Sequence, residues 1–146
     1  MERKIPNNEL IKAVITMLNE GHTVTLRLKG FSMRPYLENN RDKVLLAKPT
    51  HITKGDVVLA EVLPQKYALH RIVKIEGEKV TLLGDGNIVA EHCMRKDVKA
   101  FAVGFYRKGR NKLEKTNCIK WKCYSFLWMT LLPLRRILLG MYKKML

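Results

Sequence analysis

The chain has 146 residues, of which 47% are hydrophobic and 28% are charged, a composition that excludes a disordered chain and favours one domain with a real core. The formal net charge is +15, but residues 107–146 hold eleven Lys or Arg against one acid, Glu114, so +10 of it lies in the tail. The three cysteines, Cys93, Cys118 and Cys123, form no CxxC pair, so we expect reduced thiols, no disulfide framework, no metal and no other cofactor.

The N-terminal residues predict one amphipathic helix. The opening of the chain is polar and lacks the apolar core of a signal peptide. Asn7 or Asn8 is expected to cap the helix, with Glu9 in its first turn, and Gly21 to end it. Between them, apolar residues recur at helical spacing: Leu10, Ala13, Val14, Met17 and Leu18.

From residue 23 the pattern changes to that of a β-domain. Alternating or apolar runs predict strands at 23–29, 43–47, 57–63, 67–75, 79–83 and 98–106. Glycine-containing turns separate several of them, and Gly104 is expected to mark a bend or bulge in the last strand. Many short strands at regular spacing predict a mainly β fold, an antiparallel barrel-like core. We therefore divide the chain into a β-domain with its helix, 1–106, and a tail, 107–146.

The tail begins with a basic connector, 107–122, and continues as an amphipathic helix. Its apolar side chains share one helical face, and Pro133 is expected to kink or break the helix. The members of that face are Tyr124, Leu127, Trp128, Leu131 and Leu132. Its uncharged run, 123–134, is too short to cross a bilayer. Two placements stay open: residues 119–146 lie in a membrane interface, or the helix packs on the sheet or on a partner.

One serine has an unusual setting, in the stretch GFSMRP. Ser32 follows a predicted strand and Gly30, and Pro35 stands three positions later. The residue is either part of a turn or a nucleophile. A serine hydroxyl needs a base to take its proton before it can attack a carbonyl.

His70 is the best candidate for that base. It is the histidine that lies inside an apolar strand pattern, where a polar ring needs a partner or a purpose, although a structural role is the plain alternative. Lys66 lies on the same face of the strand pattern as His70 and is a weaker candidate for the base. Asp85, in the stretch LLGDGN, is the candidate to orient His70, although Gly-Asp-Gly-Asn is also what a tight turn requires.

Taken in order, these stretches resemble the signal peptidase and self-cleaving repressor superfamily of serine peptidases, which share a coiled β-fold. GFSMRP is similar to the nucleophile box, KGDVVL to the Gly-Asp box that precedes an apolar strand, and LHRIVKI to the box that holds the base. His70 followed by Arg71 is closest to the histidine-dependent endoplasmic-reticulum-type signal peptidases. LLGDGN is similar to the box whose aspartate serves that histidine.

The resemblance implies a serine endopeptidase that cleaves leader or signal-type peptides, with small residues near the cut. Ser32 would be the nucleophile, His70 the base and Asp85 the orienting carboxylate. Met33, Gly30 and Pro35 would shape the substrate and oxyanion site, and Arg71 and Asp56 would support it. Signal peptidases often have serine where this chain has Gly30, so the oxyanion would depend mainly on backbone N–H groups.

The implied partners are a peptide or precursor protein and, through the tail, a membrane surface. We expect peripheral association on the cytoplasmic side and a prokaryotic origin. The alternative function is a membrane-associated module on the same fold that binds a peptide without cutting it. Nucleic acid is disfavoured, because the excess charge lies in an amphipathic tail and no aromatic-studded basic strand occurs.

Overall fold

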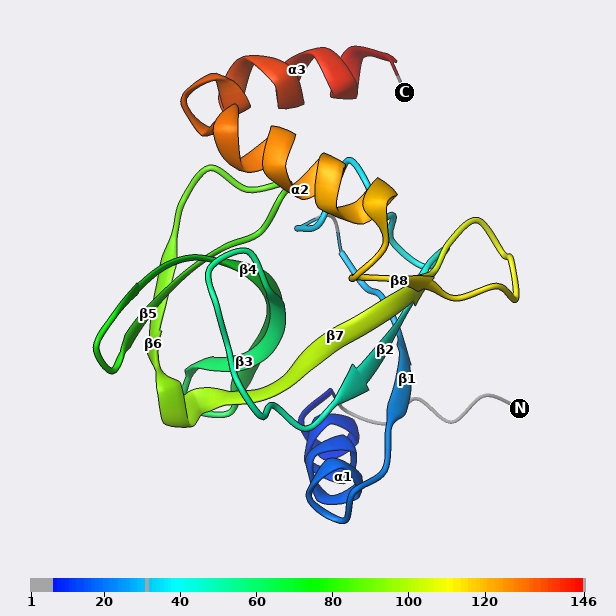
Figure 1. The fold of residues 1–146 in the computed structure, drawn as a ribbon, viewed down its shortest axis with the longest axis vertical. Coiled ribbons are helices and arrows are strands. Elements are labelled where there is room, and N and C mark those ends of the chain that lie inside the picture. Colours follow the sequence, from blue (N-terminus) through cyan, green and yellow to red (C-terminus); the bar gives the residue numbers. More distant parts are fainter. Residues whose placement is uncertain (1–6, 31, 146) are drawn as a thin grey trace.

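The computed structural model describes residues 7–30 and 32–145, as one antiparallel sheet with helices at opposite ends of the molecule (Figure 1). The predicted polar opening of the chain, 1–6, and the capping side chain of Asn7 or Asn8 lie outside what the structure describes. The N-terminal helix is confirmed as α1 (Asn7–Asn19). It buries Ile11, Val14 and Leu18.

The mainly β fold is confirmed. The strands are β1 (Val24–Arg27), β2 (Lys43–Ala47), β3 (Val57–Leu63), β4 (Lys66–Glu76), β5 (Lys79–Leu83), β6 (Glu91–Met94), β7 (Val98–Tyr106) and β8 (Glu114–Lys115), with the short 3₁₀ helix η1 (Arg95–Asp97) between β6 and β7. They lie in the order β1-β2-β7-β3-β4-β5-β6, with β8 on β7, and every neighbouring pair is antiparallel. The sequence patterns did not predict β6 and β8.

The expected barrel-like closure is not what the structure has, because the sheet is open. Within the described residues, β1 and β6 stand at its two ends and do not pair with each other. Both edge strands are only four residues long, and short edges offer little backbone for further pairing. The expected irregularity at Gly104 is found: the β2–β7 register shifts between Leu45 and Leu46, opposite Gly104 and Ala102.

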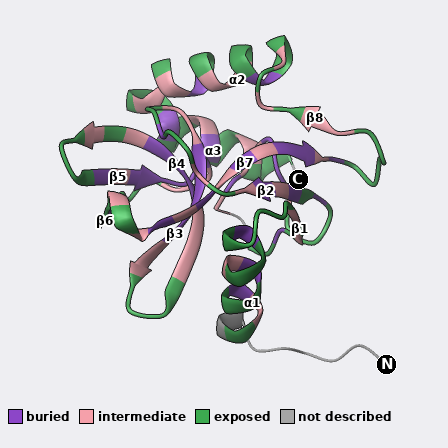
Figure 2. Cartoon of the chain, turned by 60° about the horizontal axis from the view of Figure 1, so that its bottom comes forward, coloured by how far each residue is buried: buried purple, intermediate pink, exposed green. Residues whose placement is uncertain are grey.

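Two hydrophobic clusters hold the sheet together, and their buried residues are seen along the strands in Figure 2. One lies among β3, β4, β5, β6 and the start of β7. The other joins α1, the loop after β1, β2, β7 and the tail, where Trp121 packs 4.8 Å from Phe105 and 5.1 Å from Tyr36 between ring centroids. The tail therefore shares a core with the sheet.

The tail forms α2 (Ile119–Thr130), the 3₁₀ turn η2 (Leu132–Leu134) and α3 (Arg135–Met145), which cover one end of the molecule opposite α1 (Figure 1). The predicted break near Pro133 is found. The predicted common face is wrong in part, because Trp128 is buried against the protein while Leu127 points outward. Within the described residues, no helix combines the length and the apolar character needed to span a bilayer.

Candidate active site

Ser32 lies in the long connection between β1 and β2, where the chain turns sharply. Gly30 has a φ of +84°, a left-handed conformation that favours glycine, and its N–H donates to Asn39 Oδ1 at 2.7 Å. The carbonyl oxygen of Ser32 accepts the Gly86 N–H at 2.8 Å. The serine is thus held by its backbone, and this half-buried residue lines two cavities.

Met33 and Pro35 follow the serine in the same turn. Met33 is buried in the hydrophobic cluster and also lines the larger cavity. Pro35 follows a cis peptide bond from Arg34 and belongs to the same turn. Among the described residues, the N–H groups of Ser32 and Met33 donate to no acceptor. The role in binding an oxyanion that the sequence predicts for these groups stays a prediction.

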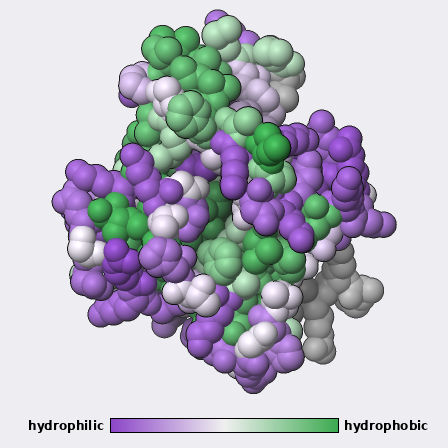
Figure 3. Space-filling view, in the orientation of Figure 1, coloured by the Kyte–Doolittle hydropathy of each residue, from purple (hydrophilic) through white to green (hydrophobic). Residues whose placement is uncertain are grey.

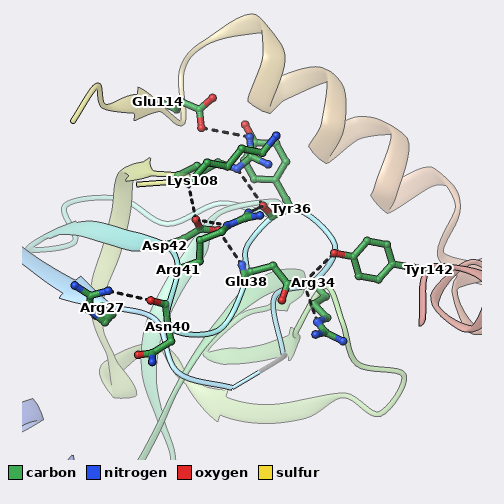
Figure 4. A network of polar contacts seen from close by, with 11 residues as sticks. Arg27, Arg34, Tyr36, Glu38, Asn40, Arg41, Asp42, Lys108, Glu114 and Tyr142 are labelled. Carbon is green, nitrogen blue, oxygen red and sulfur yellow. Dashed lines mark hydrogen bonds and ion pairs between the residues drawn. The ribbon is translucent and has the colours of Figure 1, made fainter. Parts of the chain in front are cut away.

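A polar network fixes the rest of this connection (Figure 4). The buried carboxylate of Asp42 accepts from the Arg41 guanidinium, from the Glu38 N–H and from the Lys108 N–H, all at 2.8–2.9 Å. Arg34 forms an ion pair with Glu38 at 2.8 Å, and Tyr142 of α3 donates to the same carboxylate at 2.8 Å. The loop after Ser32 is therefore held both by the sheet and by the tail.

His70 lies in the middle of β4, opposite Val58 of β3, and lines the same cavity as Ser32. Gly84 stands between the two residues. A Cβ at position 84 would overlap the Ser32 carbonyl oxygen and come within 3.0 Å of His70 Cδ2, so only glycine fits there. Among the described residues no hydrogen bond joins Ser32 Oγ to His70. Lys66, the rival base, is an exposed residue at the start of β4.

The imidazole of His70 is almost fully buried, and burial lowers its pKa below the ordinary 6.5 although nearby carboxylates raise it. The nearest of these is Glu91, whose Oε1 lies 3.3 Å from His70 Nδ1. That contact does not meet the geometry of a hydrogen bond, so Nδ1 has no hydrogen-bond partner among the described residues. Glu91 begins β6, a strand that sequence patterns missed, and this is why it was not a candidate.

Asp85 does not have the partner that the sequence predicts. Its two carboxylate oxygens accept Nε–H and Nη2–H of Arg71, each at 2.8 Å, and both side chains are fully buried. Tyr124 of α2 donates to the same carboxylate at 2.7 Å. No hydrogen bond among the described residues joins Asp85 to His70. Burial forces a carboxylate to find charged donors, and Arg71, which carries several donors in a fixed fork, satisfies it better than one imidazole.

Arg71 and Asp56 have supporting positions. Arg71 Nη1 donates to the carbonyl oxygen of Gly55 at 3.0 Å. The Asp56 carboxylate accepts the Thr53 N–H at 2.9 Å, and its backbone carbonyl accepts the Ile72 N–H at 2.7 Å. These bonds tie the turn before β3 to β4, next to the candidate base.

The tail holds the loop that separates Ser32 from His70. Trp128 Nε1 donates to the Asp85 carbonyl at 3.0 Å, and Arg135 donates to the Gly84 carbonyl at 3.2 Å. Arg135 is buried 5.2 Å from the centroid of the Trp128 ring, and burial lowers its pKa. Sequence patterns assigned the tail to a separate segment and therefore did not predict that it contacts the site.

Ser32 opens onto a cavity of about 570 Å³ whose walls are mostly apolar. Its lining includes Leu10 and Ile11 of α1, Leu28 before the serine loop, and Tyr67 and Leu69 beside His70. A second cavity of about 400 Å³ lies on the other side of Ser32, between the loop 84–87 and α3. The serine thus stands between an apolar cavity and a more polar one.

This arrangement combines a serine held by its backbone, a buried imidazole and an apolar cavity, without a hydrogen bond between the serine hydroxyl and the imidazole in the described residues. Comparison with known proteins adds no family to this picture, because no protein-family model and no curated protein matches the chain.

Proposed function

We propose that the chain is a serine endopeptidase of the signal-peptidase-like type, and that its open sheet is a version of the coiled β-core of that superfamily. The observation that carries the proposal is the common cavity of Ser32 and His70, with Gly84 packed between them. The order of the sequence motifs supports the same conclusion.

In this mechanism Ser32 Oγ attacks the carbonyl carbon of a peptide bond. His70 Nε2 takes the hydroxyl proton and gives it to the leaving amine, and the N–H groups of Ser32 and Met33 receive the oxyanion. Water then attacks the acyl-enzyme, with His70 again as base, and releases Ser32. When the 3.3 Å distance between Glu91 Oε1 and His70 Nδ1 shortens, Glu91 Oε1 accepts the Nδ1–H of His70. Glu91, rather than Asp85, then orients the imidazole.

The substrate in this proposal is an extended leader-type peptide with an apolar residue in the larger cavity. A cavity of about 570 Å³ has room for a side chain larger than the small residues that the family resemblance implies. The second cavity, which includes Arg34 and Lys143, receives the part of the peptide beyond the cut. Peripheral attachment at the cytoplasmic face of a membrane, by the tail, belongs to the same proposal.

The test is cleavage of a complex peptide library, with new termini identified by mass spectrometry. Wild type is expected to cut after apolar residues, and Ser32→Ala and His70→Ala are expected to lose the activity. The chain has only one other serine, so Ser125→Ala is the matched control and should cut normally. Cleavage that survives in Ser32→Ala would contradict the proposal.

Two variants of α1 test the cavity separately. Leu10→Trp narrows the cavity and should reduce cleavage after large apolar residues more than cleavage after alanine. Lys12→Trp adds the same ring on the exposed side of α1 and should leave the preference unchanged.

The second candidate function is a module that binds a peptide and does not cut it. The absence of a hydrogen bond between Ser32 Oγ and His70 in the described residues favours it. In that case wild type and Ser32→Ala would bind the same leader peptides with equal affinity, and no new termini would form.

A further inference from the structure

The helix α2 has apolar side chains on two opposite faces. Trp121 and Trp128 point into the protein, seven residues apart. Ile119, Phe126 and Leu127 point outward, at positions i, i+7 and i+8, and Phe126 is 75% exposed. A helix that only covered the sheet would need the first face and would present polar residues on the second.

The next elements continue the outward face. Leu134 of η2 and Ile137, Met141 and Met145 of α3 are exposed at positions i, i+3, i+7 and i+11. The inward side of α3 is different, because Arg135 and Leu139 are buried there. Figure 3 shows apolar residues gathered over the end of the molecule that the tail helices cover. We call these seven outward residues the apolar tail face: Ile119, Phe126, Leu127, Leu134, Ile137, Met141 and Met145.

Positive charge borders the apolar tail face. Lys122 flanks the outward side of α2, and Arg136 and Lys144 are exposed on α3. Lys120 of α2 forms an ion pair with Glu114 at 2.8 Å, and Lys143 lines the second cavity. Residues 116–146 contain no acidic residue. Two copies of this face would bring like charges together, which opposes self-association. An anionic bilayer surface complements both the apolar residues and the charges, because long basic side chains reach headgroups while apolar ones enter the acyl boundary.

We propose that the apolar tail face binds the surface of a bilayer that contains anionic phospholipids. The helices lie in the interface and do not cross it. Trp128 and Arg135 tie them to the loop 84–87, so the cleft at Ser32 is held at a fixed position relative to the lipid surface. The lipid contact does not require the peptidase activity, so a failure of one leaves the other standing.

The test is flotation of the full chain with vesicles of phosphatidylcholine alone or with 30% phosphatidylglycerol. Wild type is expected to float with the mixed vesicles. Phe126→Ser and Ile137→Ser should each weaken the partition coefficient about tenfold, since each removes one large apolar side chain from the acyl boundary. Lys122→Gln should weaken it about fivefold, and only on the anionic vesicles.

The matched control is Leu63→Ser, because Leu63 is exposed to a similar extent as Ile137, 58% against 63%, but lies in the β3–β4 hairpin. It should float like wild type, and far-UV circular dichroism should show all four variants folded. The proposal is overturned if wild type does not float, or if Phe126→Ser and Ile137→Ser float as wild type does. It is also overturned if sedimentation shows a dimer that Phe126→Ser dissociates, or if the face instead binds RNA with a steep salt dependence.

Discussion

The buried imidazole of His70 has the Glu91 carboxylate beside Nδ1, and His70 lines the cavity that Ser32 also lines. A histidine accepts a proton only in its neutral form, so the rate of a reaction that uses it as a base rises with pH through its pKa. Burial keeps that pKa below 6.5, while Glu91 and, less strongly, Asp85 oppose the shift. The pKa of His70 therefore depends on burial and on two carboxylates, Glu91 of β6 and Asp85 of the loop 84–87.

The first prediction concerns the pH dependence of kcat/KM for a cleaved peptide. The acidic limb should have its midpoint below pH 6.5, because the imidazole of His70 stays neutral in the folded protein at lower pH than in water. Glu91→Gln removes the charge that raises the pKa, so the midpoint should move further down. The plateau should also fall about tenfold or more, because the ring loses its orienting group.

Lys99→Gln is a suitable control, because Lys99 lies on β7 at a distance from the cavity and the substitution changes the charge by one unit. It should leave both the midpoint and the plateau unchanged. An acidic limb with its midpoint at or above pH 6.5 would show that His70 is not the base. A midpoint that Glu91→Gln moves upward would show that Glu91 does not act on His70.

Single residues differ in how far the sequence could predict them. Ser32 and His70 became candidates because each stands in a local pattern of its own, a glycine-proline turn and an apolar strand. Asp85 was given His70 as its partner but pairs with Arg71, since the spacing of residues cannot decide between two neighbouring donors. Glu91 lies in a run of charged residues, where only knowledge of β6 would have singled it out.

At the scale of elements, α2 is bound to the loop 84–87 through a buried charge. The Asp85 carboxylate accepts from Arg71 and Tyr124, and its backbone carbonyl accepts from Trp128. Burial and the adjacent carboxylate raise the pKa of Tyr124, so its hydroxyl remains a donor throughout the accessible pH range. The tail is therefore a structural part of the site.

The second prediction follows for the free energy of unfolding. Asp85→Asn leaves the Arg71 guanidinium buried without its counter-charge and should destabilise the protein by about 3 kcal/mol or more. Tyr124→Phe keeps the ring and removes one hydrogen bond to a charged group, which should cost about 2 kcal/mol. Urea unfolding followed by far-UV circular dichroism measures both.

Glu76→Gln serves as the comparison, because it breaks an ion pair with Lys74 whose members are largely exposed. It should not change the unfolding midpoint measurably. Equal midpoints for Asp85→Asn and Glu76→Gln would mean that the Asp85 cluster does not hold the tail.

The elements themselves were predictable where their periodicity is strong. Helix α1 and strands β2, β3, β4, β5 and β7 follow the runs of apolar residues. Strand β6 did not appear in the pattern because Cys93 alone among its four residues is buried, and β8 has only two residues. The tail was ambiguous for a physical reason: α2 is apolar on both sides, and a sequence cannot say which side meets the core.

At the scale of the whole molecule, the tail and the sheet enclose Ser32 from two directions. The apolar cavity lies toward α1 and the second cavity toward α3, and Gly86 and Asn87 of the loop 84–87 line the second cavity. An extended peptide that crosses the serine would therefore contact both the N-terminal and the C-terminal helices.

The central claim is that Ser32 is a nucleophile activated by His70, and covalent labelling tests it most directly. A fluorophosphonate probe should add once to wild type and to Ser125→Ala, with the adduct on the peptide that contains Ser32 in intact-mass and tryptic analysis. Ser32→Ala should not be labelled, and His70→Ala should be labelled about 100-fold more slowly, since it lacks the base. No adduct on wild type, or an adduct that persists in Ser32→Ala, would contradict the account.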